Sequence, residues 1–94
     1  MSPYSSRMSE HADFDAAVAA VKGLTKDPGN ETKLRMYALY KQATEGDASG
    51  KRPGFTNPVG RAKYDAWAAL TGSSQDDARA QYVAMVEELV AADG

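Results

Sequence analysis

The spacing of apolar residues in the last quarter of the chain constrains the fold most strongly. Two adjacent rows recur there at helical spacing, namely Ala78, Tyr82, Met85 and Leu89 in one row and Val83, Val86 and Val90 in the other. A helix with two neighbouring apolar rows has a wide face to bury, which is typical of a helix packed centrally in a bundle. No stretch of the sequence alternates with the period of two that a half-buried strand requires, so the sequence predicts an all-α fold.

The same period predicts three further helices upstream. The first covers about residues 10–22, where Phe14, Ala17, Val18 and Val21 form one apolar stripe, and we expect Phe14 in the core. The remaining helices are expected over about residues 30–44, over about residues 59–70, and from a cap at Ser74 to about residue 91.

Residues that favour helix starts stand at the expected boundaries. Asn30 is a good N-cap for the second helix, and Pro58 fits the first turn of the third, where its missing N–H costs little. Ser74 with Asp77 resembles a capping box, with Asp in place of the usual Glu or Gln.

The segment 45–54 is predicted to be a loop because it holds three glycines and one proline in ten residues. It is long for a connection between bundle helices, and long ordered loops are often functional. Lys51 and Arg52 lie within it, and the alternative to a functional loop is a solvated connector whose charges only confer solubility. We expect Phe55 to tether the loop to the core.

The composition indicates one small domain in a reducing compartment. The 94 residues contain no cysteine and a single histidine, His11, so disulfides, thiolate metal sites and histidine-rich clusters are excluded. Residues 1–9 are predicted to be a mobile extension, with the helical domain over residues 10–94. The first residues lack the apolar run of a signal peptide, and no window approaches the ~20 apolar residues of a membrane span, so we expect a cytoplasmic protein.

Charge is distributed unevenly along the chain. Residues 31–63 have a net charge of +4, whereas the rest of the chain has −6, which gives −2 in total. A basic middle segment in an acidic protein indicates a local anion site rather than a nucleic-acid surface, which usually has a broad basic footprint. A chance cluster of solvated charges is the alternative.

Tyr37, Tyr40 and Lys41 are spaced i, i+3, i+4, so a helix places two phenols and one ammonium group on one face. An aromatic ligand that carries phosphates needs this combination of ring surface, hydroxyls and cation. The alternative is a partly buried amphipathic helix with a solvated lysine, because such helices are common.

Several separate blocks in this order resemble the acyl-CoA-binding protein family. They are Tyr37-x-x-Tyr40-Lys41-Gln42-Ala43-Thr44-x-Gly46-Asp47, then Arg52-Pro53-Gly54, Gly60-x-Ala62-Lys63-x-Asp65-Ala66-Trp67, Gly72-x-Ser74, and Tyr82-x-x-x-Val86-Glu87-x-Leu89. The resemblance covers about residues 14–89. It implies an up-down-down-up bundle of four helices and a non-catalytic, monomeric carrier of medium- to long-chain acyl-CoA esters, which it delivers to lipid-metabolising enzymes.

The resemblance also implies site residues. Acyl-CoA is a ligand rather than a cofactor, and no metal or nucleic acid is expected. The implied ligand contacts are Lys22, Tyr37, Tyr40, Lys41, Lys63 and Tyr82, with Phe14, Ala17 and Val18 near the acyl chain and Arg61 as an auxiliary phosphate contact.

Some positions depart from the family pattern. Val59 stands where members often have a lysine, Asn57 replaces an acidic residue and precedes an unusual proline, and Tyr64 replaces a tryptophan. These changes keep open an alternative function, a helical protein-interaction module that has lost or altered the ligand. A thioesterase has little support, because the chain lacks a cysteine nucleophile and His11 has no evident Ser/Asp partners.

Overall fold

A computed structural model describes residues 13–93, which are helical at residues 13–21 and in α2 (Asn30–Glu45), α3 (Pro58–Ala68) and α4 (Gln75–Asp93). The predicted extension 1–9, the predicted start of the first helix at Glu10 and His11 lie outside the described residues. Within the described part of the chain there is no strand, and none of its helices is long and apolar enough to cross a membrane.

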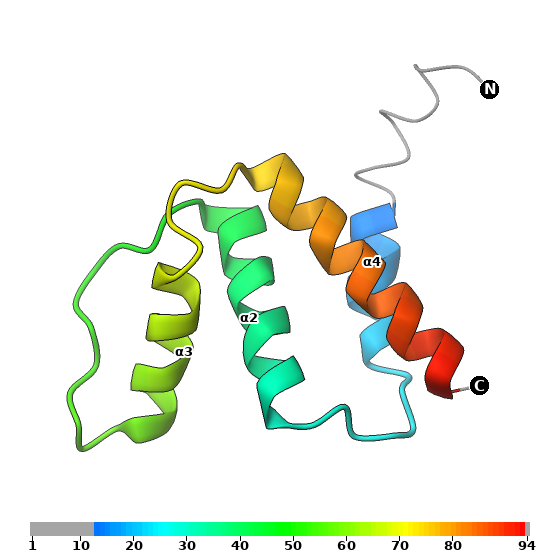
Figure 1. Cartoon of the computed structure of the whole chain (residues 1–94), viewed down its shortest axis with the longest axis horizontal. Helices are drawn as coiled ribbons and strands as arrows, with labels where there is room; N and C mark the ends of the chain where they lie inside the picture. Colours follow the sequence, from blue (N-terminus) through cyan, green and yellow to red (C-terminus); the bar gives the residue numbers. More distant parts are fainter. Residues whose placement is uncertain (1–12, 94) are drawn as a thin grey trace.

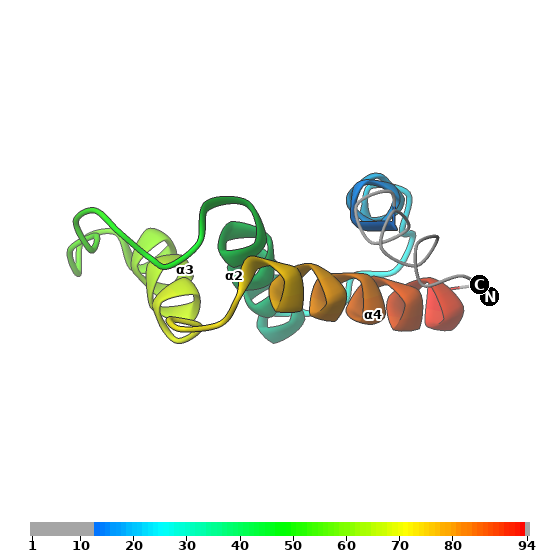
Figure 2. The ribbon, with the colours of Figure 1, turned by 90° about the horizontal axis from the view of Figure 1, so that it is seen from above.

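The helices form the predicted up-down-down-up bundle. The first helix and α4 run in one direction, whereas α2 and α3 run parallel to each other in the opposite direction (Figure 1). Viewed from above, α2, α3 and α4 form one layer, and the first helix lies on one face of it (Figure 2).

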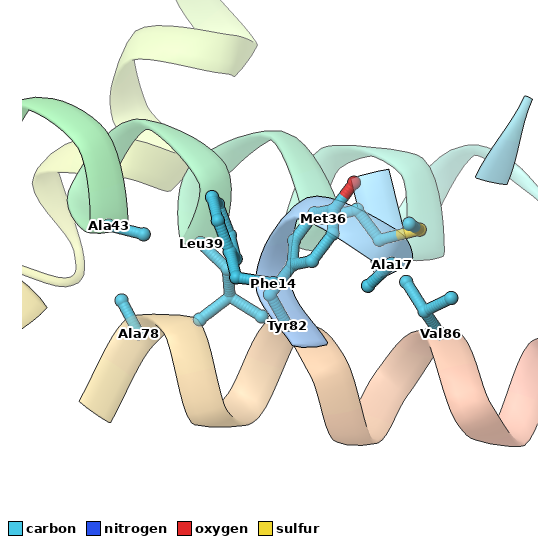
Figure 3. Close-up of a cluster of buried hydrophobic side chains, with 8 residues drawn as sticks. All are labelled: Phe14, Ala17, Met36, Leu39, Ala43, Ala78, Tyr82 and Val86. Atoms are coloured by element: carbon cyan, nitrogen blue, oxygen red, sulfur yellow. The ribbon is translucent and has the colours of Figure 1, made fainter. Parts of the chain in front are cut away.

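The apolar core lies between the first helix, α2 and α4. Their side chains point toward one another there (Figure 3). The buried cluster contains Phe14 and Ala17 from the first helix, Met36, Leu39 and Ala43 from α2, and Ala78, Tyr82 and Val86 from α4. Phe14 is therefore in the core, as predicted, whereas α3 contributes no residue to this cluster.

The buried row of α4 differs from the two predicted rows. Ala78, Tyr82 and Val86, spaced four residues apart, are buried, whereas Val90 is exposed. Val83, Met85 and Leu89 are partly buried and pack against the same cluster, so both predicted rows face the core. The predicted wide apolar face is confirmed up to Leu89, and the exposed Val90 at its C-terminal end is the exception.

Two of the predicted helix starts are confirmed and one is wrong. The backbone N–H of Asp77 donates to Ser74 Oγ at 3.0 Å, and Pro58 occupies the first turn of α3. Asn57 Oδ1 accepts from the N–H of Gly60 at 3.1 Å, so this departure from the family pattern is the N-cap of α3. Asn30 is not a cap, because α2 already includes it and Gly29 precedes the helix with no side-chain cap.

The long loop at residues 46–57 is explained by the parallel arrangement of α2 and α3. A 16-residue helix is about 24 Å long, and the chain must return along this length before α3 can start. The loop is held on α3: Arg52 forms two hydrogen bonds of 2.7 Å with Asp65, and the Tyr64 hydroxyl donates to the Gly50 carbonyl at 3.2 Å. Phe55 is 83% exposed, so the prediction that it tethers the loop to the core was wrong.

The end of α4 is tied to the turn before α2 by Asp93. Its carboxylate accepts from the backbone N–H groups of Thr25 at 3.1 Å and Lys26 at 2.7 Å. These hydrogen bonds hold the pKa of Asp93 below its usual value, the Thr25 N–H first and the Lys26 N–H second.

Candidate functional site

Three aromatic rings meet where the first helix, α2 and α4 converge. The ring of Phe14 stacks on Tyr40 with centroids 6.1 Å apart and meets Tyr82 edge-on at 5.2 Å. Tyr82 is buried, and this desolvation raises the pKa of its phenol, so the group stays neutral and available as a hydrogen-bond donor. Tyr40 remains 40% exposed and forms the outer edge of the cluster.

Beside these rings lies an open hollow of about 540 Å³, which we call the aromatic hollow. The tyrosines of its wall come from α2 and α4, and its charges come from the turn before α2 and from the first turn of α2. It is lined by Val21, Leu24, Thr25, Lys26, Asp27, Pro28, Lys33, Met36, Tyr37, Tyr40 and Tyr82. A hollow with three phenol rings and two ammonium groups, against the single carboxylate of Asp27, suits a flat, anionic ligand.

A second hollow of about 400 Å³, the apolar hollow, lies between α2 and α3. Its wall is mainly aliphatic, and two lysines stand on it. It is lined by Asn30, Lys33, Leu34, Tyr37, Pro58, Val59, Ala62 and Lys63. Such a surface suits a hydrocarbon segment attached to a negatively charged group.

Lys33 and Tyr37 line both hollows, so they lie between them. The ammonium group of Lys63, from α3, lies 5.4 Å from the centroid of the Tyr37 ring, within the range of a cation–π contact. Lys33 is also paired with Asp27 at 3.0 Å. The structure therefore brings the predicted residues Tyr37 and Lys63 together and adds Lys33 to them.

Lys41 lines neither hollow. Its ammonium group pairs with Glu45 on the next turn and lies 4.8 Å from the centroid of the Trp67 ring. The hydrogen bond to Glu45 raises the pKa of Lys41, with smaller electrostatic contributions from Glu45, Tyr37 and Tyr40, so the side chain is cationic and close to both phenols.

The other predicted contacts lie outside the two hollows. Lys22 is exposed just after the first helix, and Arg61 is half-buried on α3, close enough to Asp65 to help lower the pKa of that carboxyl after Arg52. Ala17 is buried against α4, and Val18 packs at the edge of the same core cluster.

Sequence reasoning missed several residues that line the hollows. Lys33 is four residues before Tyr37, so extending the Tyr37/Tyr40/Lys41 face by one helical turn would have found it. The family pattern marks Val59 only as the loss of a cation, yet its side chain is part of the aliphatic wall of the apolar hollow. Leu34 and Ala62 carry no local signal, because their role depends on how α2 and α3 pair.

Neither hollow contains a donor set typical of a metal centre. Among residues 13–93 there is no group of three or more His, Cys, Asp or Glu side chains that could hold a metal ion. The two hollows present rings, hydroxyls, ammonium groups, aliphatic side chains and the carboxylate of Asp27, which pairs with Lys33.

Both the sequence and the fold are similar to those of known proteins. The sequence profile of the family described as "Acyl CoA binding protein" matches residues 11–86. Acyl-CoA-binding protein homolog 1 of Caenorhabditis elegans is 47% identical over 78 residues, which cover 83% of this chain and 91% of that protein. The acyl-CoA-binding protein of Dictyostelium discoideum is 46% identical over 76 residues, with coverage of 81% and 90%.

Other relatives are much longer. Enoyl-CoA delta isomerase 2 of Rattus norvegicus is 53% identical over 77 residues, which cover 82% of this chain but 20% of the isomerase. The human isomerase of the same name is 49% identical with the same coverage. The chain thus spans about a fifth of the length of these two enzymes.

Solved structures agree with the sequence comparison. Acyl-CoA-Binding Protein 2 of Oryza sativa superposes with a TM-score of 0.88 at 38% identity, over 93% of this chain and 95% of that one. The ACBP of Moniliophthora perniciosa gives a TM-score of 0.82 at 38% identity, over 88% and 82%.

Proposed function

This chain belongs to the acyl-CoA-binding protein family, and we propose that it binds medium- to long-chain acyl-CoA esters and transports or buffers them without transforming them. The observation that carries the proposal is the pair of adjoining hollows of different chemistry, one aromatic and charged and one apolar, with Tyr37 and Lys33 between them.

An acyl-CoA ester needs two such surfaces side by side. Its headgroup contains an adenine ring and phosphates, whereas its tail is a hydrocarbon whose exposure to water costs roughly 0.8 kcal/mol per CH₂. In our proposal the headgroup occupies the aromatic hollow against Tyr37, Tyr40 and Tyr82. The tail lies in the apolar hollow against Leu34, Val59 and Ala62.

The cations would hold the phosphates where the two parts of the ligand join. Lys63 and Lys33 stand beside Tyr37, so both can reach an anion between the hollows. We propose Lys41, which lies near the phenols of α2, as a further contact that exchanges Glu45 for a phosphate. Lys22 and Arg61 line neither hollow, and we propose them as contacts to the outer parts of the headgroup.

In this proposal the acyl chain lies between α2 and α3, whereas the family resemblance places it near Phe14, Ala17 and Val18 of the first helix. Phe14 and Ala17 are 7% and 6% exposed, so they are covered by other side chains and offer little surface. Val18 packs at the edge of the same core. The side chains that line the apolar hollow are more accessible, since Val59 alone is 64% exposed.

Binding alone is the proposed activity. The two isomerases share with this chain only a fifth of their length, so their activity is not transferred to it. We propose a monomeric cytoplasmic carrier that holds the ester reversibly and passes it to lipid-metabolising enzymes.

Calorimetric titration with palmitoyl-CoA, CoA and palmitate tests the proposal. We expect 1:1 binding of the ester and much weaker binding of either half, because each half fills only one hollow. Comparable binding of CoA and the ester would contradict a role for the apolar hollow.

Matched variants separate the two hollows. Lys63→Ala should weaken binding of the ester by about 1.5–3 kcal/mol, the range for charged hydrogen bonds. Lys51→Ala removes an exposed loop lysine and should leave the affinity unchanged. Ala62→Gln should weaken the binding of palmitoyl-CoA but leave the affinity for CoA unchanged, because it places an uncharged polar amide in the apolar hollow. Ala84→Gln, on the exposed side of α4, is its control.

If no ligand of the three binds to the folded protein, the protein-interaction module becomes the better reading. The departures that motivated it have structural roles, however, because Asn57 caps α3 and Val59 lines the apolar hollow. They therefore do not count against ligand binding.

A further inference from the structure

Two of the most exposed apolar side chains lie together at one end of the molecule. Phe55 is 83% exposed and Val59 is 64% exposed, and they are four residues apart at the junction of the long loop and α3. In Figure 1 this junction forms the lower left corner, at the opposite end from the C-terminus of α4. We call residues 54–59 the tip.

Local hydrogen bonds fix the tip, although its apolar side chains face water. The N–H of Asn57 donates to the Gly54 carbonyl at 3.0 Å, and Asn57 Oδ1 accepts from the N–H of Gly60. The loop just before the tip is attached to α3 by Arg52 and Asp65. Phe55 is therefore held outward by an ordered turn, at the cost of about 1.5–3 kcal/mol of forgone apolar burial.

The sequence on both sides of the tip is basic. Residues 48–64 contain Lys51, Arg52, Arg61 and Lys63 and no acidic residue. Arg52 is neutralised by Asp65 just beyond this segment, but Lys51, Arg61 and Lys63 take part in no ion pair within residues 13–93. An exposed aromatic ring with nearby cations is complementary to the interface of an anionic bilayer, where the ring enters the headgroup region and the cations meet the lipid phosphates.

We propose that the tip docks the protein reversibly on anionic lipid membranes, with Phe55 entering the interface. Val59 belongs both to the tip and to the wall of the apolar hollow, so docking places the mouth of that hollow at the membrane surface. A hydrocarbon tail would then pass between bilayer and hollow without crossing bulk water. One ring and a few cations give weak attachment, which suits a protein that must also leave the membrane.

The test uses the full chain without acyl-CoA, so its result does not depend on the proposed function. Sedimentation with vesicles of phosphatidylcholine containing about 30% phosphatidylserine should show binding that falls with added salt, and pure phosphatidylcholine should bind far less. Phe55→Ser should reduce the partition coefficient about tenfold, and Lys51→Gln about fivefold.

Val90→Ser is the matched control, because Val90 is an exposed apolar residue near the end of α4, and it should bind vesicles like the wild type. Phe55 lines neither hollow, so the affinity of the Phe55→Ser variant for palmitoyl-CoA, measured by calorimetry without vesicles, should be unchanged.

Insertion itself can be read from Phe55→Trp, whose fluorescence should be quenched by brominated lipids, measured against the Trp67 background of the wild type. Equal binding of Phe55→Ser and Val90→Ser, equal binding to neutral and anionic vesicles, or unquenched Phe55→Trp would overturn the proposal. In those cases the tip is a surface for another kind of partner or for none.

Discussion

The two sides of α2 are held by different forces. On one side the first helix and α4 bury an apolar cluster that includes Phe14, Leu39 and Tyr82. On the other side α3 buries a single residue, Trp67, whose indole N–H donates to the Gly46 carbonyl at 2.8 Å. The first side is stabilised mainly by the hydrophobic effect, whereas the second depends on specific polar links.

Gln42 is the centre of these polar links. It is fully buried, and its amide nitrogen donates to Asp47 Oδ1 at 2.8 Å and to the Ser73 carbonyl at 2.7 Å. Asp47 in turn accepts from the N–H of Gly72 at 3.0 Å. The end of α2 is thereby fastened to the turn between α3 and α4. The apolar hollow, which lies between α2 and α3, is therefore on the side of α2 with less apolar burial.

Phe14→Ala should give the largest effect on stability. It removes a ring that contacts Tyr40 and Tyr82, and such core truncations cost about 3–5 kcal/mol. Urea unfolding measures the loss, and hydrogen exchange should accelerate in α2 and α4 alike. A loss below about 1 kcal/mol would show that the apolar cluster is not the main source of stability, and it would contradict the contrast drawn between the two sides of α2.

Gln42→Leu should cost less, about 1–3 kcal/mol, because it leaves the Ser73 carbonyl without its partner in a part-buried place. Hydrogen exchange should accelerate more in α3 than in α4, which would sharpen the contrast between the sides. Glu88→Leu, at an exposed position of α4, is the control and should be nearly neutral. Uniform acceleration in all helices would show that the two sides open together.

The smallest effect is expected from acid. The Gly72 N–H first and the Gln42 side chain second lower the pKa of Asp47 from its usual value. A carboxyl with a lowered folded-state pKa stabilises the fold above its unfolded pKa, and this contribution is lost as the pH falls through the folded pKa.

Asp47→Asn should therefore reduce stability slightly at pH 6 and lose its difference from the wild type as the pH falls through the lowered pKa of Asp47, because both then carry a neutral side chain. Asp93→Asn should behave alike, since the pKa of Asp93 is also lowered. Urea midpoints from pH 6 to pH 2 measure this. A difference between Asp47→Asn and the wild type that persists at pH 2 would mean that the hydrogen bonds, not the charge, carry the effect.

Much of the fold was predictable because its signals are local. The four helices are predicted by the helical spacing of apolar residues and by the glycines and prolines between them. Phe14 and Tyr82 belong to apolar stripes that are buried in the structure. The Ser74 cap with Asp77 needs only a spacing of three residues. Tyr37 and Tyr40, which were expected on one face, line the aromatic hollow together.

The rest depends on how helices pair, which no local pattern encodes. The apolar hollow exists only because α3 runs beside α2, so Leu34 and Ala62 could not be identified in advance. Phe55 was expected in the core since burying a phenylalanine is normally favourable, but the loop directs it to solvent. Lys41 was expected to face a ligand, and its pairing with Glu45 depends on rotamers.

The parallel course of α2 and α3 also bears on the order of folding. The Trp67–Gly46 link closes a loop of 21 residues, whereas Thr25 and Asp93 are separated by 68. Loop-closure entropy makes the longer closure costlier by about 1 kcal/mol. The contact between the end of α4 and the first helix with its following turn should therefore form after α3 has joined α2. In φ-value measurements Trp67→Phe should then slow folding, whereas Val86→Ala, which truncates a buried residue of α4 beside Ala17, should chiefly speed unfolding.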